Sequence, residues 1–213
     1  MARLDRKGSF RLHGKLDTSV FCTWRDIDYM RRLPNKTKSE PSQAQIANRA
    51  KFAFVHDWLE SINDLIKVTF DTYSPKMTGR MAAQSYTMKN AVKGEYPDFE
   101  IDYPAALISC GRLAGVTNPK VLSPEPGILQ INWDKIVADR GKSHCNDILV
   151  FALAPESENV TFTVGQATRD KGTYLYKIPR EFIGKTAYVY IAFKSFSNND
   201  VSTSQYLGSI ILE

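Results

Sequence analysis

The longest periodic run of hydrophobic positions lies in residues 39–73 and predicts an α-helix. Its apolar residues recur at steps of three and four, which places them along one face of a helix. The stripe consists of Ile46, Phe54, Trp58, Ile62, Leu65 and Phe70. Ser42 is the expected N-cap, and Gln45 completes a capping box. We therefore expect helix over residues 42–74, with a break near residues 61–63 where Ser and Asn favour a new cap.

A second helical pattern follows over residues 78–93. Thr78 or Gly79 would begin this helix, and Gly94 is a suitable C-cap because glycine readily adopts a left-handed conformation. One face of the helix would carry Met81, Ser85, Met88 and Val92. Two helices joined by a short loop predict an antiparallel helical hairpin.

Alternation with a period of two predicts strands in front of the helices. Residues 8–33 alternate apolar and polar positions, with turn residues at Gly14 and at residues 17–19, and predict two or three short strands. The apolar positions are Phe10, Leu12, Val20, Cys22, Trp24, Ile27, Tyr29 and Leu33. So short a meander cannot bury a face by itself. We expect it to pack on the long helix, on the second domain or on another subunit.

After Gly94 the chain changes to short alternating segments separated by turn residues. Strands are expected near residues 99–103, 106–110, 128–133, 147–153, 160–165, 172–178, 186–196 and 201–212. This spacing predicts an antiparallel β-sandwich, and Trp133 with the run TAYVYIAF is similar to fibronectin type III or immunoglobulin-like sandwiches. The predicted fold class is α+β. Residues 1–95 would form a basic N-terminal domain of short strands and a helical hairpin, and residues 96–213 the β-sandwich.

Positive charge is concentrated at the front of the chain. Residues 1–53 hold twelve basic and five acidic residues, a net charge of +7, whereas the whole chain has a net charge of +5. Such a front suits nucleic acid, an acidic protein or anionic lipid, and equally a solvated surface. The candidate partner-binding patch consists of Trp24, Arg25, Tyr29, Arg31, Arg32, Lys36 and Lys38. Arginine binds phosphate and aromatic rings stack on bases, but Asp26 and Asp28 favour a hairpin packed on the long helix.

No set of residues forms a convincing reaction centre. The nearest is His144–Cys145 with Asp147, but adjacent residues on a strand point to opposite faces. Residues 141–143, GKS, lack the first glycine of a phosphate loop and fit a turn. The three cysteines are widely spaced without a CxxC pair, so we expect free thiols rather than disulfides or structural zinc.

Three carboxylates recur at alternate positions of one expected strand. Asp98, Glu100 and Asp102 would share a face, which suits a hard cation such as calcium. The apolar residues between them favour a simpler arrangement, with the apolar face inside and the acidic face in solvent. We predict no catalytic residue, no metal and no cofactor, and we expect that the protein is not an enzyme.

The chain shows no pattern typical of membrane insertion or secretion. No apolar run approaches the roughly 20 residues of a membrane-spanning helix. Residues 1–17 are basic without an apolar core, so we expect no secretory signal and a cytoplasmic location. Association with a virion, or release by a route that needs no signal peptide, is compatible with this pattern.

Four stretches of the chain carry a resemblance to a known family. They are GSFRLHGKLDTSVFCTWRDIDYMRRLP, PSQAQIANRAKFAF, AVKGEYPDFEIDYPAALISCGRLAG and AYVYIAFKSFSNNDVSTSQYLGSI. They resemble bacterial proteins of similar length that form a family of unknown function. The phrase PSQAQIANRAKF also resembles a motif of short prophage-encoded proteins. The resemblance implies no activity, cofactor or catalytic residue.

We therefore expect a non-enzymatic structural, assembly or protein-binding protein that self-associates through its N-terminal strands. In β-augmentation, a short strand of one subunit pairs with the exposed sheet edge of another. The phage-related phrase suggests a virion-type or filament-type role. The alternative is a nucleic-acid-binding protein that uses the basic front. The sequence leaves open whether residues 1–38 pack on their own chain or on another subunit.

Overall fold

The computed structural model describes residues 2–3, 14–24, 27–35, 40–71, 73, 77–135, 143–156 and 158–213. The chain forms two compact units, Met1–Ser42 and Gln43–Glu213. The predicted division lay between residues 95 and 96, after the helices rather than before them.

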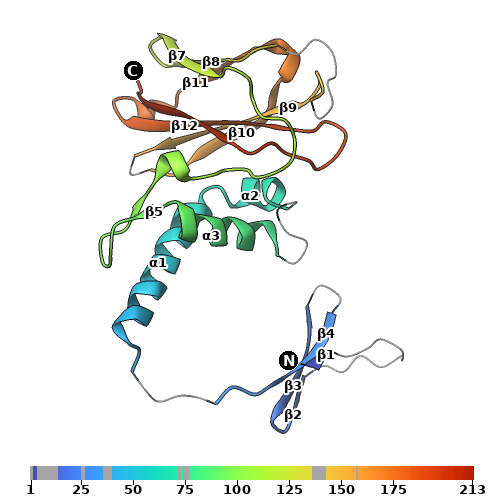
Figure 1. Cartoon of the computed structure of the whole chain (residues 1–213). Coiled ribbons are helices and arrows are strands. Elements are labelled where there is room, and N and C mark those ends of the chain that lie inside the picture. The colour runs from blue at the N-terminus through green and yellow to red at the C-terminus, as the bar shows by residue number, and fades with distance from the viewer. Residues whose placement is uncertain are drawn as a thin grey trace. The chain divides into compact units, whose positions relative to one another are not determined.

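The first unit contains a four-stranded antiparallel sheet (Figure 1). Its strands are β1 (Ala2–Arg3), β2 (Gly14–Leu16), β3 (Ser19–Trp24) and β4 (Ile27–Arg32), in the order β1-β4-β3-β2. The turn between β2 and β3 contains Asp17 at φ 50, a left-handed conformation that aspartate tolerates. Strands were expected at Val20–Trp24 and near Ile27, and both are confirmed. The expected strand at Phe10 and Leu12 lies outside the described residues.

The predicted long helix is divided into two helices. They are α1 (Gln43–Glu60) and α2 (Asn63–Thr69). The break falls where it was expected, but capping is not its cause. Ile62 occupies the N-cap of α2 without a side-chain hydrogen bond, and the Ser61 hydroxyl donates to the carbonyl of Trp58 at 3.2 Å.

The second predicted helix, α3 (Gly79–Asn90), begins where local chemistry places it. The Thr78 hydroxyl accepts a hydrogen bond from the Met81 amide at 3.3 Å, which confirms Thr78 as its N-cap. The C-cap is Ala91, so the prediction of Gly94 was wrong. Gly94 instead has φ +78 in the turn after β5 (Val92–Lys93), where a Cβ would collide with the Asp98 carbonyl.

Two antiparallel sheets face each other in the second unit (Figure 1). One has the order β10-β9-β12-β13, with β9 (Ile148–Pro155), β10 (Thr161–Thr168), β12 (Thr186–Lys194) and β13 (Gln205–Ile211). The other has the order β11-β8-β7, with β7 (Lys120–Glu125), β8 (Ile128–Asn132) and β11 (Thr173–Lys177). A small ladder pairs β5 with β6 (Glu100–Ile101), and short 3-10 helices span Tyr103–Ala105, Arg169–Lys171 and Arg180–Phe182.

This architecture confirms the predicted α+β class with an antiparallel sandwich. A strand at residues 106–110 was wrong, because this segment has no regular strand structure. Strand β7 was not predicted, because its side chains are mostly exposed and do not alternate.

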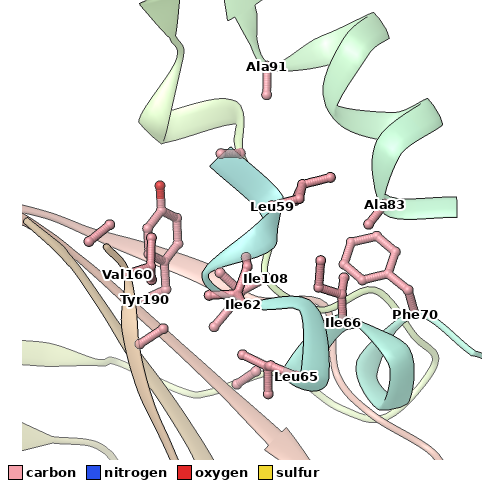
Figure 2. Packing of buried hydrophobic residues seen from close by; sticks show 14 of the residues in the cluster. Leu59, Ile62, Leu65, Ile66, Phe70, Ala83, Ala91, Ile108, Val160 and Tyr190 are labelled. Atoms are coloured by element: carbon pink, nitrogen blue, oxygen red, sulfur yellow. The ribbon is translucent and has the colours of Figure 1, made fainter. Parts of the chain in front are cut away.

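Strands β9 and β12 are buried on both faces. Toward β8 and β11 they share a core that contains Phe151, Leu153, Val189, Ile191, Phe193, Leu129, Ile131 and Tyr176. Their opposite faces pack on the helices through Val150, Ala152, Ala154, Tyr190 and Ala192, against Leu59, Ile62, Leu65, Ile66, Phe70 and Ala83. Figure 2 shows Tyr190 of β12 and Val160, which directly precedes β10, on one side of Ile62, and Phe70 and Ala83 on the other. The helices thus share a core with the sandwich, which explains why both belong to one compact unit.

The buried faces of the helices differ from the predicted stripes. In α1 the fully buried residues are Val55 and Leu59, whereas Trp58 is only half-buried. In α3 the small residue Ala83 is buried and Met81 is 46% exposed. Close helix packing explains this choice, since a Cβ on Gly79 would collide with the Ile66 carbonyl.

The helix core can be tested with Leu59→Ala. This change should lower the free energy of unfolding by about 2–5 kcal/mol, because Leu59 is fully buried and its truncation leaves a cavity. Urea unfolding measures the loss. Phe52→Ala, on the same helix and 50% exposed, is the control and should change stability by about 1 kcal/mol or less. Equal losses at both positions would show that the assigned buried face is wrong.

Candidate functional site

The register of the N-terminal sheet sorts the predicted patch residues between two faces. Cys22 pairs with Tyr29, Trp24 with Ile27, and Val20 with Arg31. Directly paired residues share a face, and alternate residues of a strand share it too. One face therefore carries Val20, Cys22, Trp24, Ile27, Tyr29 and Arg31, which we call the Trp24 face.

The structure brings together only part of the predicted patch. Trp24, Tyr29 and Arg31 lie on the Trp24 face, whereas Arg32 pairs with Ser19 on the opposite face. Arg25, Lys36 and Lys38 lie outside the described residues. The described patch is thus an aromatic and aliphatic surface with a basic end, rather than a continuous row of cations.

The Trp24 face is only partly buried in its own unit. None of the described residues between 14 and 35 is fully buried. Trp24 is 45% exposed and Ile27 39% exposed, and Cys22 and Tyr29 are half-buried. Lys15 pairs with Val20, which in turn pairs with Arg31, so two cations flank one end of the apolar surface.

The residues of the predicted nucleophile set have different environments. Asp147 is fully buried, and one of its carboxylate oxygens accepts a hydrogen bond from the backbone amide of His144 at 3.0 Å. The His144 side chain is exposed, and Cys145 is half-buried. The carboxylate of Asp147 is thus held by a backbone amide and by a buried arginine rather than by an imidazole.

That arginine, Arg169, forms a buried ion pair with Asp147. Its Nε lies 3.1 Å from the carboxylate, and its terminal nitrogens donate to the carbonyls of Gly115 and Ala114 at 2.8 and 2.9 Å. The guanidinium also lies 4.0 Å from the centroid of the Phe193 ring. Burial lowers the pKa of Arg169, and the Asp147 carboxylate acts in the opposite direction. Each of the three guanidinium nitrogens has an acceptor, so the cluster ties the loop at residues 114–115 to the sandwich.

The predicted row of three carboxylates is not assembled into a metal site. The strand is only two residues long, Glu100–Ile101, and Asp102 forms an ion pair with Lys93 at 2.9 Å. Within the described ranges, no group of three or more His, Cys, Asp or Glu residues is arranged to hold a metal.

Sequence reasoning missed a groove that runs beside α1. A hollow of about 740 Å³ lies between the C-terminal half of α1, residues 99–103 and the β9–β10 hairpin, and a second of about 500 Å³ lies beside the N-terminal half. Phe99 lines both hollows, and we call them together the α1 groove. Its wall includes Tyr103 and Tyr188, whose rings stack at 3.5 Å between centroids. Burial raises the pKa of Tyr103, with smaller contributions from Tyr188 and Glu156.

The geometry defines a β-sandwich covered by helices on one face and preceded by a small sheet. The family model for a family of unknown function, DUF6266, matches residues 11–208, and the chain belongs to this family. The predicted resemblance to a family of unknown function is confirmed, whereas bacterial origin stays a prediction.

Two solved structures similar to this chain are β-sandwich proteins. One is a fibronectin type III domain of the human collagen alpha-1(XX) chain, with 10% identity, 47% of this chain and 85% of that domain covered, and a TM-score of 0.35. The other is a redesigned β-sandwich protein, with 15% identity, 48% and 97% coverage, and a TM-score of 0.30. No curated protein sequence matched. In the part of the chain that the structure describes, every helix is too short or too polar to span a bilayer.

The buried ion pair can be tested with Arg169→Met. This change should cost about 3–5 kcal/mol of unfolding free energy, because it leaves the Asp147 carboxylate buried without its cation. Urea unfolding measures the difference. Lys67→Met is the control: it removes an exposed pair with Asp64, at 2.9 Å, and should cost at most about 1 kcal/mol. A variant at Arg169 as stable as the parent would contradict the assigned role.

Proposed function

We propose that this chain is a non-enzymatic assembly protein that associates with further copies through the Trp24 face. The observation that carries the proposal is the exposure of this face in a unit whose described residues include none that is fully buried. Small sheets need a covered apolar face to be stable. A second copy presents the same surface, so two copies would cover each other by twofold symmetry.

The edges of the N-terminal sheet offer a second kind of contact with another copy. Among the described residues, the outer strands are short: β2 has three residues and pairs with residues 19–21 of β3, and β1 has two and pairs with residues 29–30 of β4. The outer strands of a sheet are suited to β-augmentation by a neighbouring chain. A virion-type or filament-type role would use such repeated contacts.

A nucleic-acid-binding function is the second candidate. Trp24 and Tyr29 share a face with Arg31, and Lys15 stands in the same cross-strand row as Arg31. Exposed aromatic rings with adjacent cations can stack bases and contact the phosphates of a single strand. Within residues 1–42 there are ten basic and five acidic residues, which favours a polyanion.

Self-association can be tested by light scattering on the full chain. The parent should have a mass above the 24.1 kDa of one chain, rising with concentration. The double variant Trp24→Glu/Ile27→Glu should return the mass to that of one chain, because it would bury two carboxylates in the contact. Leu16→Glu is the matched control, since Leu16 is 66% exposed and lies on the opposite face of the same sheet, and it should still associate. A parent of one-chain mass at every concentration would remove the proposal.

The nucleic-acid alternative can be tested by fluorescence anisotropy with a labelled oligothymidylate. If the chain binds nucleic acid, its affinity for the oligothymidylate should fall steeply as salt is added, because binding releases counterions. Trp24→Ala should weaken binding by about 1–3 kcal/mol through lost stacking. The absence of any binding to the oligothymidylate, to duplex DNA or to RNA at low salt would exclude this function.

A further inference from the structure

One face of α1 lines the α1 groove along the whole length of the helix. The lining residues of the helix fall in groups three or four positions apart, which are Gln43 and Ala44, Ala47 and Asn48, Lys51, Phe54, and Asp57 and Trp58, and Ser61 follows the helix. In Figure 1 the N-terminal half of α1 extends away from the two sheets of the sandwich, and residues 94–96 of the loop after β5 line the hollow beside it. The helix therefore presents a continuous surface to this groove.

The larger hollow of the groove is lined by carboxylates. Its lining includes Asp57, Glu100, Glu156 and Glu158 but no lysine or arginine. Glu158 is paired with Lys185 at 2.6 Å, and Asp57 lies 3.8 Å from the Nδ1 of His56. No ion pair within the described ranges involves Glu100 or Glu156, and both are exposed. The negative charge of these two residues is therefore available to a cation.

The same hollow has an aromatic wall. The rings belong to Phe54, Trp58, Phe99, Tyr103 and Tyr188. Aromatic faces attract ammonium and guanidinium groups, and the aliphatic stems of lysine and arginine pack well on them. Rings beside carboxylates thus match a long cationic side chain better than a small inorganic cation.

Trp58, one of the lining residues, also carries a hydrogen-bond donor without an acceptor. The indole Nε1 of Trp58 is buried and has no hydrogen-bond partner. Buried donors are normally paired, and leaving one unpaired costs free energy. A turn of the indole toward the groove would bring this N–H to a backbone carbonyl of a bound chain, which can accept a hydrogen bond, whereas an ammonium group cannot.

The length of the groove fits an extended polypeptide. Helix α1 has 18 residues, which corresponds to about 27 Å. An extended chain advances about 3.3 Å per residue, so about eight residues would span the groove.

We propose that the α1 groove binds an extended, arginine- or lysine-bearing segment of a partner protein. Its cationic side chains lie against Glu100 and Glu156 and over the aromatic wall, and a backbone carbonyl accepts from Trp58. The groove lies in the second unit, so this binding is separate from self-association through the Trp24 face.

The proposal can be tested with a labelled eight-residue peptide of alternating arginine and threonine, titrated with the full chain and followed by fluorescence anisotropy. The peptide should bind the parent, and Glu100→Gln/Glu156→Gln should weaken binding about tenfold, since each surface charge contributes modestly. Trp58→Phe keeps an aromatic ring at this position but removes the indole N–H, and it should weaken peptide binding about three- to tenfold. Glu125→Gln, on exposed β7 outside the groove, should leave affinity unchanged. Melting curves check that each variant is folded.

A peptide with citrulline in place of arginine is the matched ligand control, because it removes the charge and keeps the shape. Equal affinity for both peptides, or no binding of the arginine peptide, would overturn the proposal. Equally tight binding of spermidine or of maltohexaose would indicate a small-cation or a carbohydrate site instead. Loss of self-association in Glu100→Gln/Glu156→Gln would identify a second copy as the occupant and would also overturn it.

Discussion

The burial of β9 and β12 on both faces is the constraint on which the second unit depends. Each of these strands contributes alternate residues to two cores, one between the sheets and one beneath the helices. Tyr190 fixes the helix side further, because its hydroxyl donates to the carbonyl of Tyr103 at 2.7 Å. In the core between the sheets, the guanidinium of Arg169 lies over the ring of Phe193. A substitution that disturbs the packing of one core should therefore also disturb the packing of the other, because β9 and β12 contribute side chains to both.

The sequence was informative where local chemistry decides the outcome. Thr78 can cap a helix wherever that helix packs, and the turn residues between β8 and β13 separate strands regardless of their partners. Which side chains of a helix are buried depends on the elements that pack against it, and the local sequence does not show which elements these are. Met81 is exposed and Ala83 is buried because α3 packs closely against α1 and α2. For the same reason, the alternating pattern predicted a strand over residues 147–153 but not the layer of helices that covers the second face of β9.

The candidate surfaces differ in the same way. Trp24, Tyr29 and Arg31 come from one hairpin, so their proximity could be predicted from sequence, whereas the exclusion of Arg32 needed the register. The α1 groove joins residues far apart in the chain, such as Trp58 and Tyr188. Since no local pattern links these residues, only the packing of α1 beside the β9–β10 hairpin reveals the groove.

The two proposed surfaces have opposite electrostatic characters. Residues 1–42 carry a net charge of +5, and the remaining residues carry eighteen basic and eighteen acidic residues, so the second unit is neutral as a whole. The acidity of the α1 groove is thus a local arrangement of side chains rather than a consequence of net charge. Contacts through the Trp24 face bury apolar surface, which salts such as sulfate strengthen. Contacts in the groove depend on exposed carboxylates such as Glu156, whose attraction to a cation weakens as salt is added, because the Debye length is only about 10 Å at 0.1 M and shorter at higher salt. The two proposals together therefore predict that high ionic strength favours contact through the Trp24 face and low ionic strength favours binding in the groove.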